Sequence, residues 1–203
     1  MCFVVTTLFM CLVLTATLDS SEGLRYNYGD GSYYIGSVDE YGKPDGIGQY
    51  YNSSGDLEYQ GGYRDGVPNG NGTWFGPNGE RLDADFVDGH AVAQGIMEFK
   101  NGDVILGLFH NHHPHGQVKI ARKNGEEITG DFRNGILHGE ISWKSATGNT
   151  MSGTYRMGRP HGNIVVVNEE GNTIYSGKFM NGQPLSQEDL PEEFQLDQIP
   201  MRV

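Results

Sequence analysis

The chain has 203 residues, a formal net charge of −12 and 31 glycines. No run of Lys or Arg occurs in it, so it lacks the basic patch on which binding to nucleic-acid phosphates depends, and we expect no nucleic-acid partner. The two cysteines, Cys2 and Cys11, lie close to the start. The rest of the chain therefore offers no disulfide framework and no thiolate metal site.

The stretch from Met1 to Leu18 carries no charged side chain, and the polar segment 19–22 follows at once. This stretch is short for a membrane span, and Thr15-Ala16-Thr17 offers small residues for cleavage. We predict a signal peptide over residues 1–18 and a secreted or secretory-pathway protein. An uncleaved anchor, and an intracellular protein associated with membranes or the cytoskeleton, remain alternatives. If the chain is secreted, Asn52 and Asn71 begin glycosylation triplets.

A pattern of glycines and aromatic residues then repeats along most of the chain. Five successive units begin at one constant interval, at Tyr59, Leu82, Ile105, Ile128 and Met151. An earlier unit begins at Tyr34, at an interval longer by two, and a truncated unit begins at Tyr175. A fixed period of roughly 20–50 residues is typical of repeat arrays, in which each unit buries its apolar face against its neighbours.

Each unit is expected to form one β-hairpin. Around the aromatic column, for example at Tyr63 and Phe86, apolar residues alternate with others, as they do in a strand with one buried face. Pairs such as Asp88-Gly89 and Asn134-Gly135 supply the positive φ that tight turns need. We predict an all-β fold, an elongated single-layer antiparallel sheet of stacked hairpins over residues 26–184.

The columns resemble the MORN (membrane occupation and recognition nexus) repeat, whose pattern is roughly Tyr-x-Gly-x-aromatic, a turn glycine, then Gly-x-Gly and an apolar strand. The unit from Tyr59 to Trp74 matches best, and the unit beginning at Met151 is also close. Some glycines of the pattern are replaced, and we expect altered local geometry there. The replacements are Ala84, Ala93, His112, Val118, Ile141 and Ile164.

Tyrosines gather in the first third of the chain. Alternation directs about half of them to the core, and the rest are expected to form an amphipathic surface for recognition. An N-terminal cap is the alternative explanation for these tyrosines. The candidate binding residues are Tyr33, Tyr41 and Tyr51.

Histidines form a second set of candidate binding residues. His115, His138 and His161 recur once per repeat and predict a ladder along one edge of the sheet. Rungs one repeat apart lie roughly 10 Å from each other, too far to share one metal ion. The resemblance to MORN repeats also implies His before this glycine as a usual turn residue. We therefore expect turn packing and no metal site, while the run from His110 to His115 is the one place that could chelate.

Residues 185–203 break the repeat and form an acidic tail. Ser186 to Asp189 resembles a helix start, and Pro191 follows shortly after. Leu190, Phe194, Leu196 and Ile199 are expected to form an apolar strip that lies as a cap over the last hairpin. A docking peptide for a partner is the alternative.

The chain carries no Gly-x-Ser-x-Gly elbow and no phosphate-binding loop. We expect a non-catalytic scaffold for protein partners, without a cofactor. Two other functions stay open. The resemblance to MORN repeats implies a phospholipid-binding module, although the charge disfavours anionic membranes. The segment from Tyr175 to Gly182 also resembles the region ahead of the catalytic domain in SET-domain lysine methyltransferases, which implies a truncated regulatory N-terminal part of such an enzyme. Unpaired edge strands predict an end-to-end homodimer.

Overall fold

The computed structural model describes residues 15–19, 23–186 and 190–194. In these ranges the chain forms one open antiparallel sheet of 16 strands, each hydrogen-bonded to its neighbours in sequence. The strands are β1 (Thr15–Asp19), β2 (Gly23–Asn27), β3 (Tyr33–Val38), β4 (Pro44–Tyr51), β5 (Leu57–Arg64), β6 (Val67–Phe75), β7 (Arg81–Val87), β8 (His90–Glu98), β9 (Val104–His110), β10 (His113–Ala121), β11 (Glu127–Arg133), β12 (Ile136–Lys144), β13 (Thr150–Arg156), β14 (Arg159–Val167), β15 (Thr173–Met180) and β16 (Gln183–Pro184).

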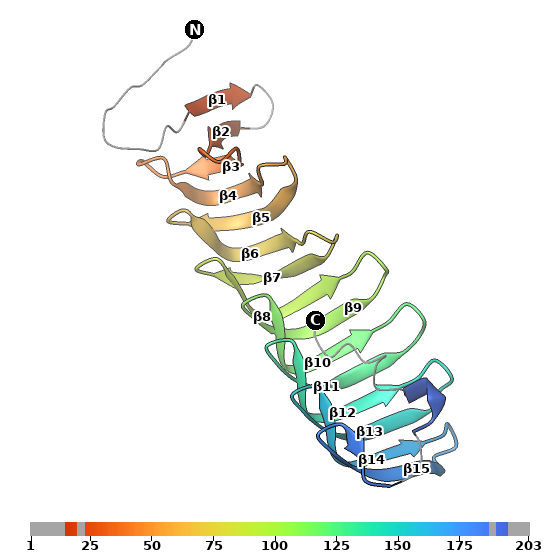
Figure 1. Ribbon diagram of the computed structural model, residues 1–203. Helices are drawn as coiled ribbons and strands as arrows, with labels where there is room; N and C mark the ends of the chain where they lie inside the picture. The colour runs from red at the N-terminus through yellow and green to blue at the C-terminus, as the bar shows by residue number, and fades with distance from the viewer. Residues whose placement is uncertain (1–14, 20–22, 187–189, 195–203) are drawn as a thin grey trace.

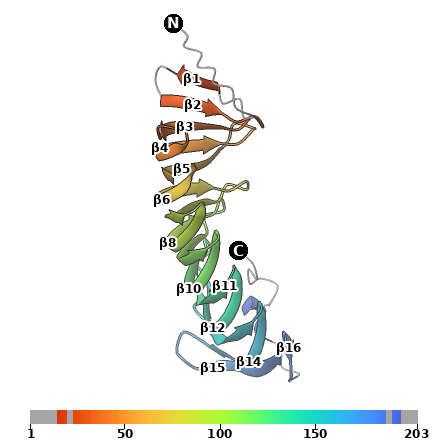
Figure 2. The same cartoon turned by 90° about the vertical axis from the view of Figure 1, so that its left-hand side faces the viewer.

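Figure 1 shows the hairpins stacked in chain order, and Figure 2 shows the sheet twisting along its length. The described residues contain no α-helix, and their one helical turn is the 3-10 segment η1 (Glu192–Phe194). The predicted all-β sheet of stacked hairpins is confirmed. The sheet also extends to β1, which overlaps the end of the predicted signal peptide. Residues 1–14 lie outside the described ranges.

Turns of two kinds alternate along the sheet. On one edge, two-residue turns such as Asp65-Gly66 place both residues at positive φ, 52° and 87°, the geometry that matches the twist of a hairpin. On the other edge, five-residue turns such as 76–80 close with a hydrogen bond from Gly76 N to Glu80 O of 2.8 Å. Together the two turns and two strands account for the constant period of the repeat.

The longer spacing of the first unit has a local cause. Five residues, 39–43, lie between the paired residues Val38 and Pro44, where the regular hairpin has the four residues 64–67 between Tyr63 and Pro68. The second added residue lies at the bulge between Tyr50 and Tyr51. The glycine missing from the turn column also has a simple substitute. His112 takes the left-handed conformation, with φ of 65°, which His adopts more readily than most non-glycine residues.

The core is one face of the sheet, along which large side chains form rows across the strands. One row of residues that oppose each other on adjacent strands runs from Tyr26 to Tyr175 across the sheet. It contains Tyr34, Tyr50, Tyr59, Trp74, Leu82, Met97, Ile105, Ile120, Ile128, Trp143, Met151 and Val166. Each hairpin therefore buries its apolar side chains against the next, as a repeat array requires.

A glycine of the pattern is replaced by a larger residue where the side chain that packs against it is smaller. The Tyr59 ring lies against Gly72, where an added Cβ would be 2.1 Å from its hydroxyl oxygen. Three repeats later, Ile128 stands in place of Tyr59, and Ile141 fills the position of Gly72. Ile128 and Ile141 are 0 % and 4 % exposed. The smaller first residue thus leaves room for a larger second one, so the departure from the repeat keeps the core filled.

The described part of the tail folds back onto the core face. Phe194 is 0 % exposed, and its ring meets Trp143 edge-on with centroids 5.1 Å apart. The segment Glu192–Phe194 therefore lies beside β12 and β13 (Figure 1). We expected the tail over the last hairpin, and this position was wrong for Phe194. Two contacts hold the segment at β12, the ring contact of Phe194 with Trp143 and the hydrogen bonds of Glu193 with Thr147 and Asn149. Leu196 and Ile199 lie outside the described residues.

Candidate functional site

The core face is covered at one end of the sheet and open at the other. Trp143 on β12 is fully buried beneath Phe194. Trp74, which holds the same column on β6, is only half-buried, and so is Tyr50 on β4. Both pack against the core from its open side. Within the described ranges, a segment of the chain lies on this position of the repeat at Trp143 and none lies on it at Trp74.

An aromatic groove of about 740 Å³ occupies the open part of the core face. We use this name for the hollow lined by Tyr28, Tyr50, Trp74, Phe86 and His112, together with Asp30, Glu58 and Tyr63. The Tyr28 and Tyr50 rings are tilted, with centroids 6.0 Å apart. The His112 ring lies 5.7 Å from that of Trp74 and 5.8 Å from that of Phe86. Half-buried rings of this kind offer apolar area together with polar tips.

The Tyr63 hydroxyl is the unpaired polar group of this groove. Tyr63 is 7 % exposed, and its hydroxyl has no hydrogen-bond partner among the described residues. By contrast, the Tyr34 hydroxyl donates to Ser37 O at 2.8 Å and that of Tyr59 to Gly62 O at 3.1 Å. Burial raises the pKa of Tyr63 well above its ordinary value, so the hydroxyl keeps its proton. A buried donor without a partner is unfavourable. The Tyr155 hydroxyl, which holds the same column in the covered part of the sheet, also has no partner among the described residues.

The charged side chains that line the groove are acidic. Asp30 lies in the turn between β2 and β3 and accepts hydrogen bonds from Ser32 N at 2.9 Å and Ser32 Oγ at 2.6 Å. These two hydrogen bonds from Ser32 hold the pKa of Asp30 below its ordinary value, and the bond from the Ser32 hydroxyl has the larger effect. Glu58 on β5 accepts a hydrogen bond from Asn52 Nδ2 at 3.2 Å. Within the described part of the chain, no Lys or Arg lines the groove.

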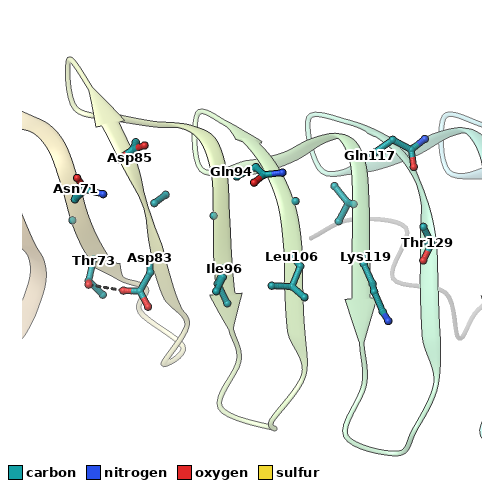
Figure 3. A pocket seen from close by; sticks show the side chains of 15 residues that line it. Asn71, Thr73, Asp83, Asp85, Gln94, Ile96, Leu106, Gln117, Lys119 and Thr129 are labelled. Atoms are coloured by element: carbon teal, nitrogen blue, oxygen red, sulfur yellow. Dashed lines mark hydrogen bonds between the residues drawn. The ribbon is translucent and has the colours of Figure 1, made fainter.

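A second hollow of about 910 Å³ lies on the opposite, outer face of the sheet, over β6 to β11. Figure 3 shows its side chains in a row across the strands, including Thr73, Asp83, Ile96, Leu106 and Lys119. Thr73 Oγ1 donates to Asp83 Oδ1 at 2.6 Å, a bond drawn in the figure. Ile96 and Leu106 oppose each other and are 42 % and 41 % exposed. Most of the side chains that line this hollow are of polar residues, and Ile96 and Leu106 lie near its centre.

The repeat columns match the family model of the MORN repeat at residues 34–57, 59–81, 129–140 and 152–163. This chain is a MORN repeat protein. The matched segments lie in β3 to β7 and β11 to β14, so the family pattern includes both the open and the covered part of the core face.

No curated protein matches the chain. Similar solved structures include the TCP domain of SAS-4 (dCPAP) of Drosophila melanogaster, in complex with a proline-rich motif of Ana2 (dSTIL). That match has 12 % identity and a TM-score of 0.49, and it covers 85 % of this chain and 96 % of the other. The wild-type TCP10 domain of Danio rerio CPAP also matches, with 15 % identity, a TM-score of 0.25, and coverage of 83 % and 100 %.

The MORN array places two of the three predicted binding tyrosines together. Tyr33 and Tyr51 stack on the outer face with centroids 4.7 Å apart and planes 10° from parallel. The Arg25 guanidinium lies 3.7 Å from the Tyr33 ring centroid. Tyr41 stands apart in the turn 39–43 and is 81 % exposed. The predicted recognition surface stays a prediction. The groove residues Tyr50 and Trp74 belong to the apolar row of the repeat, and the alternation of apolar residues cannot distinguish an open core face from a covered one.

The ladder histidines lie on alternate strands of the MORN sheet, with His115 on β10, His138 on β12 and His161 on β14. All three are partly exposed. Asn134 N lies 3.5 Å from His115 Nδ1, at the long limit of a hydrogen bond. The rings of His110 and His115 lie 5.6 Å apart. Among the described residues, no group of three or more His, Cys, Asp or Glu could hold a metal ion.

The two glycosylation triplets differ in their surroundings. Asn52 opens a turn, and its Oδ1 accepts hydrogen bonds from Ser54 N at 2.9 Å and Asp56 N at 3.0 Å. Asn71 is exposed on β6 at the outer-face hollow. Its triplet ends at Thr73, whose hydroxyl is bound to Asp83. Within the described ranges, no helix has the length and apolar character to cross a membrane.

Proposed function

We propose that this MORN array is a non-catalytic scaffold whose aromatic groove holds an extended segment of a partner protein. The contrast between Trp143 and Trp74 carries this proposal. In the C-terminal half a segment of the chain itself lies on the core face, with Phe194 against Trp143. In the N-terminal half the same column is open at Trp74. The repeat thus offers a second position for a segment, and another protein supplies it.

The chemistry of the groove supports a peptide as its occupant. Its aromatic rings offer apolar area for side chains, and Asp30 and Glu58 offer carboxylate acceptors. A peptide carries an N–H donor at every residue other than proline, so an extended segment can meet both needs at once. Aromatic residues are also enriched at protein interfaces.

The proposal is tested by selecting peptides from a displayed random library on the full chain. Selected peptides are then titrated against Trp74→Ala, with Ile96→Ala on the outer face as the matched control. We expect Trp74→Ala to weaken binding by about tenfold or more, the effect of a central aromatic contact, and Ile96→Ala to leave it unchanged. Circular dichroism shows whether each variant keeps its sheet. Equal binding to Trp74→Ala and wild type would place the site elsewhere and contradict the proposal.

We also propose a homodimer through β15. Among the residues described, its outer edge pairs with β16 at Phe179 and Met180, and Lys178 O accepts a hydrogen bond from Leu185 N at 2.8 Å. The edge around Ile174 therefore has backbone groups directed away from β14, and the Ile174 side chain is 47 % exposed. Such an edge accepts another strand. Light scattering should give twice the chain mass for wild type and a lower mass for Ile174→Lys. A wild-type monomer at high concentration would contradict this.

For location, we propose entry into the secretory pathway, supported by the uncharged stretch 1–18 and the small residues Thr15 to Thr17. Cleavage there would remove part or all of β1 and leave β2 as the first strand. Intact mass and glycan analysis of medium and lysate test this proposal. A cleaved protein in the medium is the expected result. A full-length, unglycosylated protein found only in the lysate would refute it.

A further inference from the structure

The segment that already lies on the core face shows how this face receives a peptide. Phe194 packs edge-on against Trp143, and its neighbour Glu193 reaches the turn 145–149. Glu193 accepts hydrogen bonds from Thr147 Oγ1 and, at 2.6 Å, from Asn149 Nδ2. The bound segment therefore pairs an aromatic side chain on the sheet with a charged side chain at the turn.

One turn beside the aromatic groove, 28–32, carries a carboxylate where the equivalent turn 145–149 has a hydroxyl. Thr147 directly precedes the turn glycine Gly148, and Asp30 directly precedes the corresponding glycine, Gly31. Thr147 donates its hydroxyl proton to the Glu193 carboxylate. Asp30, at the equivalent position, has a carboxylate, which only accepts hydrogen bonds when it is ionised. Glu58 adds a second acidic group to the lining. A segment whose charged side chain reaches the turn 28–32 therefore needs a cation there. The turn that follows Trp74 itself, 76–80, has Asn78 in the place of Thr147.

The rings of the groove also suit a cation. Tyr28 and Tyr50 lie beside Asp30, and the face of an aromatic ring attracts an ammonium or guanidinium group. The chain already shows such a contact nearby, since Arg25 lies 3.7 Å from the ring centroid of Tyr33 on the other face. Stacking on a ring and pairing with a carboxylate are compatible for one Lys or Arg side chain.

We propose that the aromatic groove binds a basic segment of a partner protein, with an apolar side chain on Trp74 and a Lys or Arg beside Asp30 and Glu58. This inference rests on the proposed function and names the chemistry of the partner. The tail of a second copy does not fit, because Glu192 and Glu193 would face like charges. Residues 1–14 contain no Lys or Arg, so they supply no such side chain.

The chain's own tail provides matched probes for this inference. Three peptides share the sequence of residues 190–194, Leu-Pro-Glu-Glu-Phe, flanked by Gly and Ser. In the lysine peptide both Glu are replaced by Lys, in the glutamine peptide both are Gln, and the glutamate peptide keeps the natural residues. Each is titrated into the full chain by isothermal titration calorimetry.

We expect the lysine peptide to bind about tenfold more tightly than the glutamine peptide, as is typical of a charge-assisted pair. The glutamate peptide should bind more weakly than both. The preference for lysine should fall when salt screens the charges. It should vanish in the double variant Asp30→Asn, Glu58→Gln. It should persist in Glu170→Gln, a matched carboxylate change in a distant turn.

Two results overturn the inference, and they can be told apart. Equal affinity of the wild type for the lysine and glutamine peptides would show a groove that binds segments without regard to charge. That outcome overturns the basic partner and leaves the proposed function standing. Absence of binding by all three peptides would count against the groove as a peptide site and so against both proposals.

Discussion

The exchange of volume between Tyr59 and Gly72 leads to a quantitative prediction. Gly72→Ile alone would place a Cβ 2.1 Å from the Tyr59 hydroxyl oxygen and 2.5 Å from its Cζ. Tyr59 is 4 % exposed and cannot swing into solvent. Such overpacking costs about 1–3 kcal/mol or more. Tyr59→Ile alone opens a cavity and breaks the ring contacts with Tyr63 and Phe86, at a cost of up to about 3–5 kcal/mol, the range for a buried Phe cut to Ala.

The double variant Tyr59→Ile, Gly72→Ile recreates the pair that the chain already uses at Ile128 and Ile141. We expect it to be more stable than the sum of the single changes by about 1–3 kcal/mol, the usual coupling of residues in contact. Urea unfolding followed by circular dichroism measures all four proteins, with the midpoint and slope giving the free energy of unfolding.

Gly70→Ala on the same strand is the control for this cycle. Gly70 has φ of 85° and open space around its missing Cβ, so the change should cost about 1–2 kcal/mol through the backbone alone and should not couple to Tyr59→Ile. Strict additivity of Tyr59→Ile and Gly72→Ile would refute the reasoning. Gly72→Ile with wild-type stability would refute it as well.

Phe194→Ala should uncover Trp143, shift its fluorescence to the red and lower stability by up to about 3–5 kcal/mol; an unchanged spectrum would contradict the tail contact. Burial of the imidazole is the main cause that lowers the pKa of His112 below 6.5, and the nearby His90 and His113 lower it further. The unfolded chain therefore binds a proton at His112 more readily than the folded chain does. Stability should therefore fall as the pH drops below about 6.5, and the urea midpoint of His112→Asn should vary less; an equal slope would contradict this. Gly135→Ala should cost about 1–2 kcal/mol, because its φ is 75°; a neutral result in urea would contradict a strained turn.

The regular parts of the fold can be predicted from the sequence because each repeat position has one structural role, either in a strand with a buried face or in a tight turn. Tyr63 and Phe86 mark strands with a buried face, and Asp65-Gly66 marks a tight turn; these assignments need only local geometry. The replacement of Gly72 by Ile141 in a later repeat is different, since its meaning depends on the size of the side chain that packs against it. A single column cannot show that exchange, whereas two columns compared across repeats can.

The candidate site was harder to predict for a related reason. Trp74 and Trp143 have the same place in the repeat, and only the position of Phe194, which lies far along the chain from both, makes one buried and the other open. Long-range packing of an irregular tail leaves no periodic signal. One signal was present in the sequence, since His112 breaks the turn column and its ring lines the aromatic groove.

The most direct test of the account uses the two tryptophans as separate reporters. The chain has only Trp74 and Trp143, so Trp143→Phe leaves a probe in the aromatic groove and Trp74→Phe leaves one beneath Phe194. Each protein is titrated with the lysine peptide, which contains no tryptophan. We expect the emission of Trp74 to change with saturation and that of Trp143 to stay constant. No change at Trp74, or a change at Trp143 of equal size, would contradict it.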